Sequence, residues 1–275
     1  MVQQTRRRAL IVPREHGAWG LLLVPLFTGL AAGFFPEHRA SALFLYTCAA
    51  LSLFALRTPV ENLLGTGTIS ARTSVERWTA LIASACFGLL ALACLIVLIW
   101  KWRYSALLLL GAVSVFAFVM QAVLRRLGRH TRTISQVVGA IALTSTAPAA
   151  YYVGTGRLDT RAFVLWTTNW IFAGNQIHFV QLRIHSARAT TCREKLATGR
   201  AFLAAQSVLL VVLVLASLSN FLPAFAIFAF VPALVRGSRW VFEKAEPLDV
   251  KRLGWSEMKQ GVAFGVLLAV AFSYW

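Results

Sequence analysis

Long apolar runs, separated by short polar and basic stretches, occupy most of the 275 residues of the chain. A helix that crosses a bilayer needs roughly 17–25 apolar residues, and most of the runs approach this length. The pattern predicts about nine spans, near residues 17–35, 41–56, 79–100, 104–124, 134–153, 162–181, 202–219, 221–235 and 260–275. We therefore expect an all-α, polytopic transmembrane helical bundle that forms a single domain over residues 1–275, with a basic cytoplasmic head at 1–15.

The composition agrees with a membrane protein. Only 13% of the residues are charged, against about 25% in a typical soluble protein. The net charge of +17 would suggest nucleic acid as a partner of a soluble protein. Here the bases lie between apolar runs, so anionic lipid head groups are the expected partners and nucleic acid is not.

Basic residues alternate in number from one side of the predicted spans to the other. The head and the loops after spans two, four, six and eight carry 22 of the 27 Lys and Arg residues. The opposite side carries Arg39, Lys101, Arg103, Arg157 and Arg161. Because cytoplasmic loops are rich in Lys and Arg, this distribution predicts a cytoplasmic N-terminus and an external C-terminus.

Polar side chains gather at the end of the sixth span, within residues 169–188. They are Asn175, Gln176, His178, Gln181, Arg183 and Arg188. Helical spacing can place the first four on one face, and such groups are costly in a membrane unless they face protein, water or a ligand. Two interpretations remain open: a substrate pocket that opens at the membrane surface, or helix–helix hydrogen bonds with snorkelling arginines.

A second polar stretch follows span two. Pro59 should kink or end the helix there, which would place Glu61 and Asn62 at the mouth of the membrane beside Arg57 and Arg72. This stretch is either an anion-binding rim, with Glu61 as partner or base, or a helix terminus with an ordinary ion pair.

Histidines are the remaining candidates for chemistry. His16 lies where the head enters the membrane, as a pocket residue or as a satisfied interface histidine. His178 and His185 share a helix face, which is compatible with a metal, but no carboxylate or cysteine accompanies them. The aspartates are Asp159 and Asp249 alone. We therefore predict no metal site and no cofactor, and expect a bound phosphate to be held by Arg and Lys.

The N-terminal region resembles a known family. The string PREHGAWG at residues 13–20, with Leu22 and Pro25 and followed by Arg57 and Pro59, looks like the YwiC-like family of bacterial membrane proteins. The resemblance covers most of the chain. It implies a multi-pass protein of the bacterial inner (cytoplasmic) membrane.

A more distant resemblance concerns the arrangement of the spans. Nine spans with polar cytoplasmic loops after spans two and six resemble the UbiA superfamily of intramembrane prenyltransferases. Those enzymes carry aspartate-rich motifs in both places, which hold Mg²⁺ and the prenyl diphosphate. The matching places here read Glu61-Asn62 and Asn175-Gln176-x-His178. The resemblance implies a UbiA-like arrangement of helices, but the missing carboxylates do not support a Mg²⁺ site.

These observations lead to three hypotheses for function. The first is an enzyme acting on a lipophilic substrate, isoprenoid or quinone-like, with an anionic head in a cavity open to the cytoplasm. The second is a non-catalytic binder of a lipid or cofactor, and the third is a small-molecule transporter. The catalytic candidates are His16, Glu61 and His178, and the substrate-binding candidates are Arg57, Asn62, Arg72, Asn175, Gln176, Gln181, Arg183 and Arg188.

Overall fold

The computed structural model describes residues 11, 16–33, 39–65, 71, 73–187, 189–243 and 248–275. These residues contain helices and no strand, which confirms the predicted all-α fold. Each predicted span overlaps a helix, and the span expected at 134–153 is divided between two. The α-helices are α2 (His16–Ala31), α3 (Ala40–Leu63), α4 (Ser74–Trp100), α5 (Ala106–Arg126), α6 (Arg132–Thr144), α7 (Thr146–Thr155), α8 (Thr160–His185), α9 (Cys192–Leu218), α10 (Ala226–Phe242) and α11 (Val250–Ser273), and the 3₁₀ helix η2 (Arg129–Thr131) precedes α6.

Five helical segments are long and apolar enough to cross a membrane. They are Ala40–Leu63, Ser74–Trp100, Ala106–Arg126, Arg132–Thr155 and Cys192–Leu218, and Gly17–Ala31 is a shorter apolar helix. These are the helices of a multi-pass membrane protein. The number of crossings and the orientation of the termini stay predictions.

Several helices continue beyond the apolar runs that predicted them. Helix α3 does not end at Pro59 but runs to Leu63, so Glu61 is helical. Helices α10 and α11 likewise include Arg236 and Glu257, which the sequence placed between two spans. The reason is that a helix needs only its own backbone hydrogen bonds. A change from apolar to polar side chains marks the membrane surface, and the helix continues past it.

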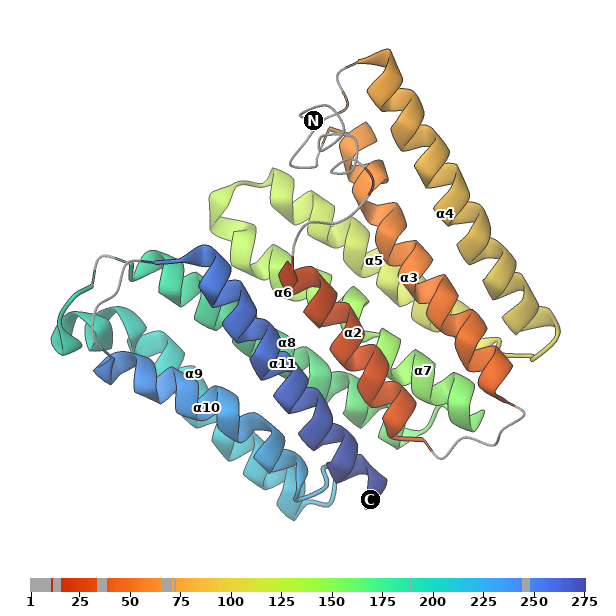
Figure 1. The fold of residues 1–275 in the computed structure, drawn as a ribbon. Helices are drawn as coiled ribbons and strands as arrows, with labels where there is room; N and C mark the ends of the chain where they lie inside the picture. Colours follow the sequence, from red (N-terminus) through yellow and green to blue (C-terminus); the bar gives the residue numbers. More distant parts are fainter. Residues whose placement is uncertain are drawn as a thin grey trace.

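Helix α2 lies between α3 and α11 in the bundle (Figure 1). It packs against α11, α7, α6 and α8, so the helix that ends the chain lies beside α2. Helix α2 approaches α7 closely at Gly29, where a Cβ atom would overlap the carbonyl oxygen of Ala147. Small residues of this kind let membrane helices pack at short separation.

The fifth predicted span is divided at Ser145 into α6 and α7, although the backbone of Ser145 keeps helical dihedral angles and its amide bonds the carbonyl of Ile141. The hydroxyl of Ser145 donates to the carbonyl of Ala142 at 2.7 Å, and that of Thr146 donates to the carbonyl of Leu143 at 2.8 Å. These side-chain bonds add acceptor partners for backbone carbonyls at the junction, where backbone groups inside a membrane must be satisfied internally. Pro148 then falls in the first turn of α7, where proline is tolerated.

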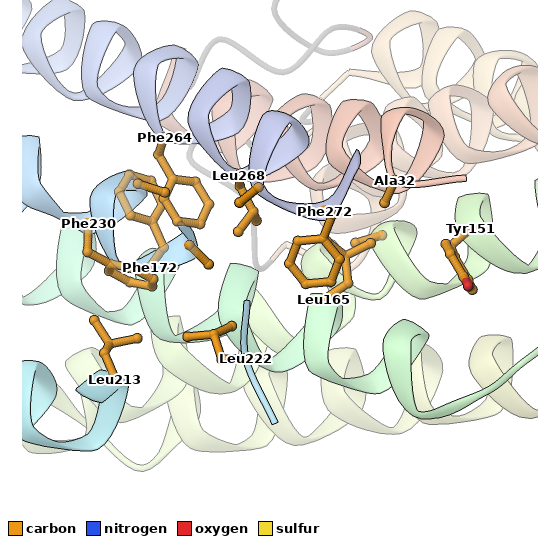
Figure 2. Close-up of a cluster of buried hydrophobic side chains, with 14 of the residues drawn as sticks. Ala32, Tyr151, Leu165, Phe172, Leu213, Leu222, Phe230, Phe264, Leu268 and Phe272 are labelled. Carbon is orange, nitrogen blue, oxygen red and sulfur yellow. The ribbon is translucent and has the colours of Figure 1, made fainter. Parts of the chain in front are cut away.

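The largest apolar cluster joins α8, α10 and α11 (Figure 2). The rings of Phe172 and Phe264 stack with centroids 3.7 Å apart, and Phe230 meets Phe264 edge-on at 5.2 Å. The same cluster extends to Ala32 after α2 and to Tyr151 in α7. Burial of these side chains fixes the C-terminal helices against the first half of the bundle.

The helices alternate in direction, so the C-terminal ends of α3, α5, α8 and α10 lie at one end of the bundle (Figure 1). Two helices that begin at this end, α4 and α9, start with a capping box. Thr73 and Thr191 each accept a hydrogen bond from the backbone of the third helical residue, Glu76 and Glu194, whose side chain bonds back. Such a box satisfies two of the free backbone donors at a helix start.

Candidate functional site

Glu61 joins the ends of α3 and α5. Its Oε1 atom accepts hydrogen bonds from Arg57 Nε at 2.9 Å and from Arg125 Nη1 at 3.3 Å. The guanidinium of Arg57 also lies 5.9 Å from the ring centroid of Phe118. The ion pair expected by one interpretation of this stretch is therefore present. The other interpretation, an anion-binding rim, stays a prediction, and Arg57 and Arg125 both already bind Glu61.

The structure describes only some of the other residues that were predicted to lie around this rim. Asn62 is buried, and its carbonyl accepts a hydrogen bond from the backbone of Ala71 at 3.3 Å. His16 is the first residue of α2. Its side chain lies outside the described part of the chain, as do Arg72 and Arg188. A single cavity that unites them with α8 stays a prediction.

The polar residues of α8 contact three different helices. Gln176 Nε2 donates to the backbone carbonyl of Glu257 on α11 at 2.8 Å. Gln181 Nε2 donates to Gln136 Oε1 on α6 at 2.9 Å. The half-buried ring of His178 meets Phe202 on α9 edge-on, with centroids 5.1 Å apart. The hydrogen bonds of the Gln176 and Gln181 side chains are interactions between helices, as the second interpretation of this stretch, helix–helix hydrogen bonding, predicts.

Asn175 differs from these neighbours. Its side-chain oxygen Oδ1 is buried and has no hydrogen-bond partner among the described residues. A buried acceptor without a partner costs about 1–3 kcal/mol. Asn175 is therefore the α8 residue best placed to bind a group that is not part of the chain.

A buried ion pair, Arg236 with Glu257, lies next to these residues and was not among the predicted site residues. Arg236 Nη1 on α10 donates to Glu257 Oε1 on α11, and the side chains are only 11% and 8% exposed. The guanidinium lies 4.1 Å from the ring centroid of Phe179 on α8. Charges buried to this degree are costly unless their hydrogen bonds are complete.

The hydrogen bonds of this pair are not complete. Arg236 Nε and Nη2 and Glu257 Oε2 have no partner among the described residues, and the same holds for both amide atoms of Gln206 and for Gln260 Oε1. We refer to these groups as the polar layer, which comprises Asn175, Gln176, Gln206, Arg236, Glu257 and Gln260. Four helices, α8 to α11, contribute to it.

Apolar clusters enclose the polar layer on both sides along the helices. On one side lie Phe172, Leu213, Phe230 and Phe264, which belong to the cluster of Figure 2. On the other side lie Phe179, Leu182, Phe202, Trp240 and Val241. Because its neighbours along the helices are apolar, electrostatic interactions within the layer are stronger than at an open surface.

The sequence contained a signal for this layer that the division into spans concealed. With spans at 221–235 and 260–275, both Arg236 and Glu257 fall in the intervening loop. A helix that begins before Glu257 and continues into the last span places Glu257, Gln260 and Phe264 on one face, at spacings of three and four residues. The chain has only 10 acidic residues, so a glutamate on the same helix face as apolar residues is a signal for a buried polar site.

The described residues do not offer the donor set of a diphosphate–Mg²⁺ site. No group of three or more His, Cys, Asp or Glu side chains among them could hold a metal ion. Oxygen ligands are what Mg²⁺ prefers, and Glu61 and Glu257 each already bind an arginine.

Comparison with protein families identifies a relationship. A family model described as YwiC-like protein matches residues 12–151, from the segment before α2 to the middle of α7. No curated protein and no solved structure matches the chain, and the UbiA-like arrangement stays a prediction. The matched region includes Arg57 and Glu61, whereas the polar layer lies beyond it. Because the match spans half of the chain, the protein belongs to the YwiC-like protein family.

Proposed function

We propose that this membrane protein binds a lipophilic molecule with an anionic head, such as an isoprenoid or quinone-like compound, in its bundle. The observation that carries the proposal is the polar layer. Its unpartnered atoms lie on four helices and face an apolar interior, where each one costs free energy. A ligand head would complete their hydrogen bonds, and the apolar helices would accept its tail.

The position of the polar layer supports entry from the end of the bundle where the predicted cytoplasmic loops lie. Arg236 is six residues from the end of α10, which corresponds to about 9 Å at 1.5 Å per residue. Arg183 stands in the last turn of α8, at the same end. Basic residues there would attract an anionic head from the inner leaflet of a bacterial cytoplasmic membrane.

The test is retention of lipid by the purified protein. Native mass spectrometry of protein extracted in a mild neutral detergent should show a lipophilic adduct. The substitutions Asn175→Ala and His178→Ala should remove the adduct while leaving the melting temperature nearly unchanged. Arg157→Ala, at the opposite end of the bundle, is the control. An adduct that survives both α8 substitutions, or none in the wild type, would overturn the proposal.

Transport of a small molecule is a second candidate, favoured by the irregular turn at Ser145 and by Pro148, which follows it within the same apolar segment. Apolar segments interrupted by proline mark the binding sites of many transporters, and Ser145 also bonds Ser114 of α5 at 2.8 Å. Release of the identified ligand from one side of a proteoliposome to the other would support transport. Binding without movement across the bilayer would leave the binder.

A further inference from the structure

We infer that the polar layer binds one monoanionic head that presents two oxygens to Arg236 and donates hydroxyl groups to the surrounding acceptors. The inference rests on the proposed function, since this head belongs to the lipophilic molecule. It goes further by specifying the charge of the head and its hydrogen-bonding groups. A phosphodiester with hydroxyl groups fits this description, and a carboxylate fits the part that contacts Arg236.

The free edge of Arg236 indicates the paired oxygens. Nη1 is engaged with Glu257, whereas Nε and Nη2 are buried and have no partner among the described residues. These two nitrogens lie along one edge of the planar guanidinium and direct their N–H groups in parallel. Such a fork matches the two oxygens of a carboxylate or phosphate.

The protein holds this fork in a fixed orientation. Phe179 lies against the guanidinium at 4.1 Å, and Glu257 holds its other edge. Lys195 shows the contrast: it is also buried, but its ammonium bonds the backbone carbonyls of Trp240 and Glu243 at 3.4 and 2.5 Å. Lys195 therefore completes the end of α10, while Arg236 has donors left for another molecule.

The charge balance indicates a single negative charge on the head. Arg236 and Glu257 neutralise each other as an ion pair. Arg183 is close enough to Glu257 to interact with it electrostatically, so one positive charge remains among these three side chains. A monoanion balances this charge. A diphosphate would add excess negative charge beside Glu257, where repulsion is strong in an apolar environment.

The other unpartnered atoms are mostly acceptors, and they indicate hydroxyl groups. They include Asn175 Oδ1, Glu257 Oε2 and Gln260 Oε1, and Gln206 adds both a donor and an acceptor. Asn175 lies one turn before Phe179, which contacts the guanidinium, and Gln260 lies one turn after Glu257 on α11. Gln206 Nε2 lies 3.6 Å from where a Cβ of Gly237 would be, next to Arg236. Acceptors in this position require donors, which an anion alone does not supply.

The experiment measures lipid binding to the full chain by titration in native mass spectrometry. The probes are phosphatidylglycerol, a monoanion with hydroxyl groups; phosphatidylmethanol, a monoanion without them; oleate, a carboxylate; and phosphatidylcholine, which has no net charge. We expect phosphatidylglycerol to bind most tightly and phosphatidylcholine most weakly. Equal binding of phosphatidylglycerol and phosphatidylcholine would overturn the inference. Tighter binding of oleate would assign the site to a carboxylate and remove the hydroxyl part.

Two substitutions then test the residues. Arg236→Lys keeps the charge but removes the fork, and should weaken phosphatidylglycerol binding about tenfold or more. Arg239→Lys, on the exposed side of the same helix, is the matched control. Glu257→Gln removes a negative charge from the site. It should therefore strengthen the binding of phosphatidate, which can carry two negative charges, whereas Arg236→Lys weakens lipid binding. A merely structural role for the pair would not produce opposite changes.

The outcomes also separate this inference from the proposed function. Retention of a native lipophilic adduct in both the wild type and Arg236→Lys, at unchanged affinity, would leave the proposed function standing and overturn the inference. Absence of any adduct or probe binding in the wild type would overturn both. A melting temperature measured for each variant identifies loss of folding, and in that case the affinity order of the four probes for the wild type decides.

Discussion

Gln176 Nε2 of α8 donates a hydrogen bond to the backbone carbonyl of Glu257 on α11, at a distance of 2.8 Å. The side chain of the same Glu257 binds Arg236 of α10. Helix α8 therefore holds the backbone of a residue whose carboxylate positions a buried guanidinium. The relationship explains how an uncharged amide takes part in the geometry of an ion pair formed by two other helices.

Replacing Gln176 with Leu should loosen this arrangement. The side-chain volume is nearly kept, but the bond to α11 is lost, at a cost of about 0.5–1.5 kcal/mol. We expect a melting temperature lower by a few degrees and weaker binding of phosphatidylglycerol. Gln181→Leu is the control, because it removes a bond to α6 instead. Equal loss of lipid binding in both variants would contradict a specific role for Gln176.

The Arg236–Glu257 pair should behave as a coupled unit in stability measurements. Arg236→Leu or Glu257→Leu alone leaves a buried charge unpaired, which costs about 3–5 kcal/mol. The double substitution removes both charges and should recover most of the loss. Thermal unfolding of the four proteins in detergent forms a double-mutant cycle. Additive losses in the double variant would show that the two side chains do not interact.

Two glycines set the separation of α9 and α10. A Cβ at Gly199 would lie 2.8 Å from Trp240 Cζ3, and one at Gly237 would lie 2.8 Å from Phe202 Cε1. Gly199→Ala and Gly237→Ala should therefore destabilise the protein by about 1–3 kcal/mol through overpacking. Gly254→Ala is the control, since nothing lies within 4 Å of its Cβ position. A rise in melting temperature for all three would show that helix propensity outweighs the contacts.

The distribution of basic residues predicts the orientation of the chain. With 22 of the 27 Lys and Arg residues on the side of the N-terminus, that side should be cytoplasmic and the C-terminus external. A C-terminal alkaline phosphatase fusion should be active, and a C-terminal fluorescent protein that folds only in the cytoplasm should be dark. The reverse result would mean that the number of crossings is even.

Removal of divalent metal should leave ligand binding intact. Arginine and amide groups make up the proposed contacts, so the affinity for phosphatidylglycerol should be the same in EDTA as in Mg²⁺. The titration in native mass spectrometry measures this directly. Complete loss of binding in EDTA, restored by Mg²⁺ alone, would revive the metal-dependent prenyl transfer that the UbiA resemblance implies.

The candidate site was partly predictable from the sequence. Asn175 and Gln176 were predicted because polar residues are conspicuous near the end of an apolar helix. Arg236 and Glu257 were not, because each lies beyond the apolar run of its own helix and was assigned to a loop. Pro59 was expected to kink or end a helix, and it does not end α3, which continues to Leu63. The end of an apolar run indicates where the chain leaves the membrane. It does not indicate where the helix ends, because the helix can continue with polar side chains.

The sequence by itself determined the class of fold, the approximate positions of the helices and the family. These follow from properties that are local along the chain: the length of apolar runs, the positions of basic residues and the string at residues 13–20. The tertiary structure alone decided which polar side chains have partners. Gln181 bonds Gln136 and Gln176 bonds Glu257, whereas Asn175 Oδ1 and one edge of Arg236 have no partner within the described part of the chain. Whether a polar side chain finds a partner depends on the rotation of each helix about its axis and on neighbours distant in sequence, which no local pattern specifies.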